Sequence, residues 1–253
     1  MKDSNKYAPK VTKLFRTLKQ KNSKVKQPKF ADPVEGLVYA VVSEQVSDSS
    51  AGRILRKMEK HFVDFNDLRV SRKEEILDVL GGSDDSYQQT AAALNQVLNS
   101  IYKKYDMLSL SELSEVGKRQ VRKKLEQIEG LSRFVISYCF LTVFGGHAIP
   151  LTDDMLEYLR AEELVHPRAS DDDIEGFLAR QIGLKSAYEF YWLLRAESEK
   201  GRKKRSRKAE EAEDGPSAKA GAKRAKSSPK RKVRTAKKTV KKKTGKRASK
   251  GAK

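Results

Sequence analysis

The sequence predicts an all-α fold with disordered basic arms at its N- and C-terminal ends, and three observations carry this prediction. Apolar residues between Phe30 and Glu199 recur at helical spacing, and no stretch of useful length alternates as a strand would. Capping residues and glycines stand where these stretches would begin and end. The third observation is the uneven distribution of charge.

The basic charge is concentrated at the two ends of the chain. The 253 residues carry a formal net charge of +20, yet residues 30–199 hold 20 basic and 29 acidic side chains. Residues 1–29 hold 10 basic and 1 acidic side chains, and residues 200–253 hold 24 and 4. We expect a loosely ordered basic arm over 1–29, with at most a short helix, and a helical core over 30–199. The tail over 200–253 should be disordered, because it lacks residues that could form a core.

The first half of the core is expected to be a series of amphipathic helices. Pro33 suits the first turn of a helix, and a broad apolar face follows it. After a run of capping residues, Ile54, Met58 and Phe62 share one face of a second helix. Two glycines end a third helix at Leu80. A long amphipathic helix follows over 86–105.

The second half of the core begins with a charged helix that ends near Ile128. Ser109 and Glu112 have the spacing of a capping box ahead of it. Residues 135–144 are apolar on all sides, which indicates a central buried helix. Capping residues at Thr152 and Ser170 open two further helices, and residues 186–197 close the core.

Three short motifs occur in order within this core: SEQVSD at residues 43–48, IEGLSR at 128–133 and LTDDMLEYL at 151–159. Their order and surroundings, from about Pro33 to Arg160, resemble the helix-hairpin-helix DNA glycosylase superfamily, which includes endonuclease III and the alkylbase glycosylases. The resemblance implies a DNA-binding base-excision repair protein that flips a damaged base out of the duplex.

The resemblance implies a DNA-binding role for several residues. Gln45 would reach into the duplex where the target base leaves the stack. In the hairpin, Gly130 would let the backbone approach a phosphate, and the following helix start would add its positive dipole end. Ser132 and Arg133 would contact the DNA beside it. The hairpin departs from the family pattern at Glu129, which would repel a phosphate, so a plain turn between packed helices is the alternative.

The catalytic carboxylate implied by the resemblance is Asp154, or Asp153 if the shorter spacing of the endonuclease III branch applies. It would stabilise a cationic sugar or orient the attacking nucleophile. Helix capping is the alternative role for either aspartate. The position of the lyase lysine is held by Phe134, which would stack on the flipped base or belong to the core. No lysine occurs between Lys124 and Lys185, so we expect a DNA N-glycosylase without AP-lyase activity.

No cofactor is expected, because the single cysteine cannot supply the iron–sulfur loop of the family, and the scattered histidines predict no metal site. The start of the chain lacks an apolar signal region, and the arms lack an apolar face for a membrane. We therefore expect an intracellular, monomeric protein that resides with DNA, in a nucleoid or a nucleus.

The expected partner is double-stranded DNA, with nonspecific binding of RNA through the tail, because polycationic segments displace counterions from either polymer. Candidate tail contacts are Lys203, Lys204, Arg205, Lys241, Lys242 and Lys243. The alternative function is a catalytically inactive, chromatin-associated DNA-binding protein that uses the same fold as a scaffold.

Overall fold

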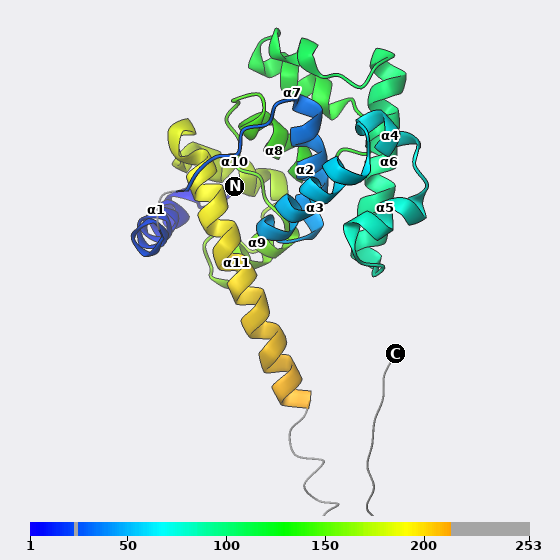
Figure 1. The fold of residues 1–253 in the computed structure, drawn as a ribbon. Coiled ribbons are helices and arrows are strands. Elements are labelled where there is room, and N and C mark those ends of the chain that lie inside the picture. The colour runs from blue at the N-terminus through cyan, green and yellow to red at the C-terminus, as the bar shows by residue number, and fades with distance from the viewer. Residues whose placement is uncertain (23–24, 214–253) are drawn as a thin grey trace, which may run out of the picture. The chain divides into compact units, whose positions relative to one another are not determined.

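The computed structural model describes residues 1–22 and 25–213, with side chains as far as Gly201, and within these ranges the chain is helical without strands (Figure 1). The all-α prediction is confirmed. The chain divides into two units, Met1–Lys208 and Ala209–Lys253, and every described helix begins in the first. In order, the elements are α1 Ser4–Lys21, α2 Pro33–Gln45, α3 Asp48–His61, α4 Phe65–Val70, α5 Lys73–Leu80, α6 Asp85–Tyr105, the 3-10 turn η1 Ser111–Ser114, α7 Lys118–Glu126, α8 Arg133–Thr142, α9 Asp153–Ala161, α10 Asp171–Gln181 and α11 Leu184–Glu213.

Helix starts are set by short polar side chains that accept hydrogen bonds from first-turn backbone N–H groups. Thr152 accepts from Met155 N, and Ser170 accepts from Asp173 N, so the two predicted starts are confirmed. The expected capping box at Ser109 is wrong. Residues Ser111–Ser114 form the 3-10 turn instead, and α7 begins later, at Lys118.

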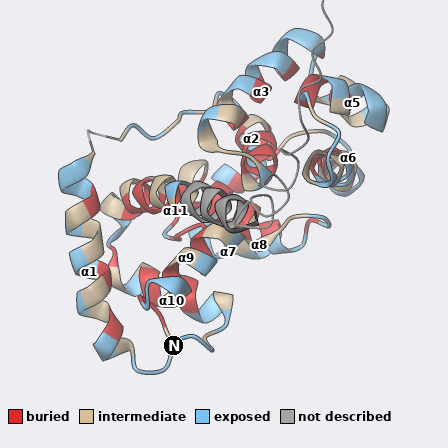
Figure 2. Ribbon diagram, turned by 90° about the horizontal axis from the view of Figure 1, so that it is seen from below, coloured by how far each residue is buried: buried red, intermediate tan, exposed pale blue. Residues whose placement is uncertain are grey.

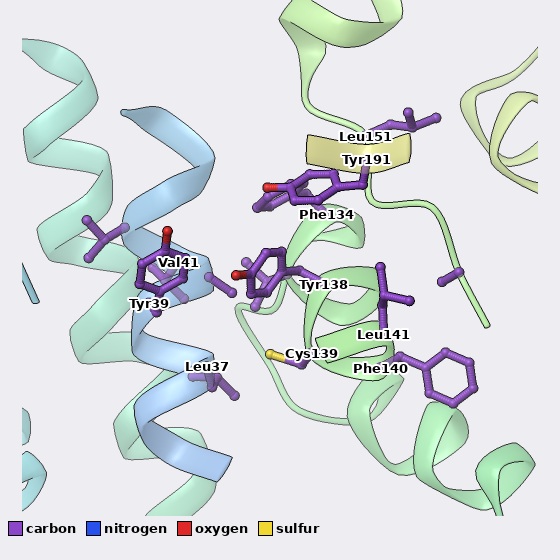
Figure 3. Close-up of a cluster of buried hydrophobic side chains, with 14 of the residues drawn as sticks. Leu37, Tyr39, Val41, Phe134, Tyr138, Cys139, Phe140, Leu141, Leu151 and Tyr191 are labelled. Atoms are coloured by element: carbon purple, nitrogen blue, oxygen red, sulfur yellow. The ribbon is translucent and has the colours of Figure 1, made fainter. Parts of the chain in front are cut away.

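The core lies where α2 packs against α3, α6 and α8. Gly36 allows α2 to approach α8 closely, since a Cβ atom there would overlap the side chain of Val143. Aromatic rings fill the junction of α2, α8 and α11. Ring centroids are 5.7 Å apart for Tyr39 and Tyr138, and 5.6 Å apart for Tyr138 and Tyr191 (Figure 3).

The N-terminal segment differs from the loosely ordered arm that we expected. Helix α1 has 18 residues, and Tyr7, Val11 and Leu18 are buried in it, while other residues of the helix are exposed (Figure 2). These three residues follow a helical stripe that packs on the core, and α1 contacts α10. Burial of this stripe accounts for the ordered helix despite its many lysines.

The C-terminal boundary also differs from the expected one. Helix α11 continues past residue 200 to Glu213, so no break in the helix separates core from tail there. The disorder predicted for residues 214–253 lies outside the described residues. In the described part of the chain, no helix has both the length and the apolar character needed to cross a membrane.

Candidate active site

Three helix ends meet around a polar pocket of about 250 Å³. The C-terminal end of α2 supplies Glu44 and Gln45, and the starts of α8 and α9 supply the rest. The lining residues are Glu44, Gln45, Arg133, Phe134, Leu151, Thr152, Asp153 and Asp154. The fold therefore brings together five residues that were singled out from the sequence, although the first of them lies more than one hundred positions before the last; they are Gln45, Arg133, Phe134, Asp153 and Asp154.

A second hollow of similar size, about 230 Å³, lies between α3 and α4. Its walls are mostly apolar side chains such as Met58, Phe62 and Leu68, with Glu59 and Asp64 as its acidic members. Among the described residues that line it, there is neither an amide nor an arginine, whereas the polar pocket has both. The polar pocket is therefore the better candidate for chemistry.

The two aspartates of the pocket lie in the first turn of α9. Thr152 caps this helix, and its Oγ accepts a hydrogen bond from Met155 N at 3.4 Å. The positive end of the helix dipole favours negative charge at this place. Asp153 is exposed, whereas Asp154 is half-buried and also lines an adjoining hollow with Arg195 and Glu199.

Glu44 is a pocket residue that sequence reasoning missed. Burial raises the pKa of its carboxyl group; the hydrogen bond with the Ser132 side chain lowers this pKa, and nearby Asp153 raises it again. Glu44 also lies at the negative end of the α2 dipole, which disfavours a carboxylate. An acidic residue in the last turn of an apolar helix was the signal that could have identified it.

Arg195 is a second residue that the sequence did not reveal. It is only 4% exposed, and its guanidinium donates hydrogen bonds to the main-chain carbonyls of Ser43 and Val46 at the end of α2. It also donates to the Tyr191 hydroxyl at 2.6 Å and to Glu199 Oε1 at 3.2 Å. The guanidinium therefore holds the end of the helix that carries Glu44 and Gln45.

The turn between α7 and α8, where the resemblance implied a hairpin, contains a glycine in the left-handed conformation. Gly130 has a left-handed φ of 85° and is exposed, and a Cβ atom there would lie 3.0 Å from the Gln96 side chain. Ser132 caps α8, and its Oγ accepts from Val135 N at 3.1 Å. The exposed Glu129 stands beside this turn. The turn thus requires a left-handed backbone conformation at this position, which glycine adopts without strain.

Arg133 faces carboxylates of α10. Its guanidinium nitrogens lie 3.2 Å from Asp171 Oδ2 and 3.5 Å from Asp172 Oδ1. The same Asp171 accepts a hydrogen bond from Arg160 at 2.7 Å. A phosphate would have to compete with these carboxylates for Arg133.

Phe134 lies at the boundary between pocket and core. Its ring is 3% exposed and packs 5.8 Å from Tyr138 and 5.7 Å from the Arg195 guanidinium carbon. Most of the ring therefore belongs to the core, and only a small part faces the pocket. The candidate tail contacts fall elsewhere: the side chains of Lys203, Lys204 and Arg205, and all of Lys241, Lys242 and Lys243, lie outside the described residues.

Comparison with known proteins shows the fold of this chain. No family model matches it, and no curated protein matches it significantly. Its fold is similar to those of solved endonuclease III and DNA glycosylase structures, in agreement with the fold that the resemblance implied. All the likenesses described below are structural, at low sequence identity.

Three solved structures illustrate the likeness. An endonuclease III–DNA complex has a TM-score of 0.58 at 16% identity, covering 74% of this chain and 84% of that one. The 8-oxoguanine glycosylase/lyase of Clostridium acetobutylicum in complex with DNA has a TM-score of 0.59 at 13% identity, covering 79% and 71%. The 3-methyladenine DNA glycosylase of H. pylori bound to 1,N6-ethenoadenine has a TM-score of 0.57 at 15% identity, covering 76% and 98%.

Proposed function

We propose that this chain is a monofunctional DNA N-glycosylase, which hydrolyses the bond between a damaged base and its sugar without cutting the strand. The observation that carries the proposal is the convergence of Gln45, Phe134 and Asp154 on one polar pocket beside a glycine hairpin. Solved structures with the same fold include DNA glycosylases in complex with DNA.

The catalytic carboxylate in this proposal is Asp154. It orients a water molecule toward the sugar carbon and stabilises the positive charge that develops as the base departs. Asp154 is half-buried in the pocket wall, at the positive end of the α9 dipole, and this position supports the catalytic role for Asp154 rather than for the more exposed Asp153. Among the residues that the structure describes, no lysine lines this pocket, which supports hydrolysis rather than Schiff-base formation.

Double-stranded DNA is the proposed substrate, bound by a monomer. The hairpin at Gly130 and the α8 start receive a phosphate, and exposed basic residues of α7 lie close by in sequence, namely Lys118, Arg119 and Lys123. Exposed Gln45 stands at the pocket rim, where it fills the space left by the flipped base. The basic segments at both ends increase the encounter rate with DNA.

The test is base release from duplexes that carry alkylated, oxidised, deaminated or mismatched bases. Wild-type protein is compared with Asp154→Asn, Asp153→Asn and the exposed control Glu59→Gln, with borohydride trapping alongside. We expect wild-type protein to release a base and to leave no trapped adduct. Asp154→Asn should abolish this release, and Asp153→Asn should reduce it less. Absence of release from every duplex would refute the enzymatic proposal.

A catalytically inactive DNA-binding role is the second candidate, and two observations favour it. Glu129 stands in the hairpin, and Arg133 is paired with Asp171 and Asp172 rather than presented to solvent. In that case the basic tail supplies most of the affinity for DNA or RNA, and binding falls steeply with salt. Deleting residues 200–253 should then abolish most binding; unchanged affinity and salt slope would refute this candidate.

A further inference from the structure

Two kinds of carboxyl group occupy opposite electrostatic positions in the polar pocket. Asp153 and Asp154 stand at the positive end of the α9 dipole, where negative charge is favoured. Glu44 stands at the negative end of the α2 dipole, where it is disfavoured. Paired carboxyl groups with opposed surroundings are the usual arrangement for one acid and one base in a single site.

The basic side chains near Glu44 are already engaged. Arg195 donates to two main-chain carbonyls, to Tyr191 and to Glu199, and Arg133 faces Asp171 and Asp172. Neither arginine forms an ion pair with Glu44 in the described part of the chain, although the charge of Arg195 is near enough to lower the pKa of Glu44. Burial and Asp153 act in the opposite direction, and the net effect is a raised pKa.

The remaining charged groups around the pocket are also acidic. Asp154 lines both the pocket and the adjoining hollow, and Glu199 lines the hollow. A carboxylate beside Glu44 disfavours a further negative charge there, as Asp153 does. The side-chain hydroxyl of Ser132, which is hydrogen-bonded with Glu44, and the charge of Arg195 both stabilise its carboxylate after a proton has left.

We propose that Glu44 is the general acid of base release, acting on bases that carry no charge in DNA and are therefore poor leaving groups until they are protonated. This inference rests on the proposed glycosylase function. As the glycosidic bond breaks, its electron pair passes to the base, and the carboxyl proton of Glu44 passes to a ring nitrogen of that base. Water then adds to the sugar carbon and gives a proton to Asp154, which releases it to solvent, and Glu44 regains a proton from solvent.

The role separates two classes of lesion. A base that is electrically neutral in DNA, such as hypoxanthine or 1,N6-ethenoadenine, needs a proton in order to leave as a neutral molecule. An alkylated purine such as 7-methylguanine already carries a positive charge and leaves without one. Loss of the Glu44 carboxyl group should therefore slow the release of bases of the first class and have little effect on the release of the second.

The experiment measures single-turnover release of hypoxanthine and 7-methylguanine across acidic to alkaline pH, with Glu44→Gln and the control Glu59→Gln. We expect Glu44→Gln to slow hypoxanthine release by about 100-fold or more and to remove the alkaline fall in its rate, with 7-methylguanine release within a few-fold of wild type. An equal effect on both bases, or an unchanged pH profile, would overturn the acid role while leaving the glycosylase function standing.

A carboxyl ¹³C titration of the full chain tests the acid independently of activity. One glutamate resonance should titrate above the ordinary range and be absent from Glu44→Gln. Titration of Glu44 in the ordinary range would overturn the acid role even if bases were released. If no base were released by wild-type protein, the proposed function would fail, and the acid role would fail with it.

Discussion

Replacing Arg195 by methionine should destabilise the protein strongly, because the guanidinium is buried and each of its nitrogens donates at least one hydrogen bond. Methionine retains much of the apolar stem of the side chain but has no donor. The carbonyls of Ser43 and Val46 would lose their partner at the end of α2, and so would the Tyr191 hydroxyl.

The magnitude follows from these contacts. A hydrogen bond that involves a charged group contributes about 1.5–3 kcal/mol, and removing one member of a buried charged arrangement costs about 3–5 kcal/mol. Glu199 remains 24% exposed on its side chain, so water can solvate it after the arginine is lost. We therefore expect a loss of about 3–5 kcal/mol in the free energy of unfolding. This corresponds to a fall of roughly 6–20 °C in Tm for a domain of this size.

Urea denaturation and differential scanning calorimetry of wild type and Arg195→Met measure this loss. The matched control is Arg56→Met on the exposed side of α3, which should change stability by no more than about 0.5 kcal/mol. A loss below about 1 kcal/mol in Arg195→Met would refute the reasoning that this guanidinium holds the end of α2.

Four further predictions follow from single side chains. Leu18→Ala should cost about 2–5 kcal/mol in the free energy of unfolding, because Leu18 is 2% exposed; a change near zero in urea denaturation would mean that α1 is a loose arm. The buried Tyr138 hydroxyl has no hydrogen-bond partner among the described residues, so Tyr138→Phe should leave the free energy of unfolding unchanged or raise it. Tyr39→Phe loses a 2.6 Å hydrogen bond to the Asp48 carboxylate and should cost about 1.5–3 kcal/mol. Equal losses of stability in the two variants would contradict this. Gly130→Ala should cost about 1–2 kcal/mol because of its positive φ and should weaken DNA binding; unchanged stability and affinity would argue against a built hairpin. Since the pKa of Glu44 is raised, its contribution to stability is full below the ordinary glutamate pKa of about 4.3 and is lost as pH rises through the raised value. Glu44→Gln should therefore gain stability relative to wild type as the pH rises above about 4.3. A difference in stability that stays constant with pH would contradict this.

Much of the helical layout could be predicted because its signals are local. Capping side chains at Thr152 and Ser170 and the apolar run in α8 each act within one or two turns of the chain. Helix α1 was underestimated because lysines dominate its composition. Its stripe of Tyr7, Val11 and Leu18 was visible in the sequence, but only the folded chain shows that these side chains are buried, two of them in the core.

The candidate site was predictable only in part. The grouping of Gln45, Phe134 and Asp154 came from the resemblance to known glycosylases and from no local pattern. Arg195 was missed because the carbonyls it binds lie 152 and 149 positions away along the chain. Glu44 was missed because its surroundings, including Ser132, are assembled only when α2 meets α8.

The central claim is that the pocket between α2, α8 and α9 hydrolyses an N-glycosidic bond. The most direct measurement is mass spectrometry of lesion-containing duplexes after a single turnover with wild-type protein or Asp154→Asn. The account predicts a free base and a full-length abasic strand with wild type, neither of them with Asp154→Asn, and no protein–DNA adduct after borohydride. Intact lesion strands with wild-type protein that nevertheless binds the duplex would contradict it, and so would a trapped adduct.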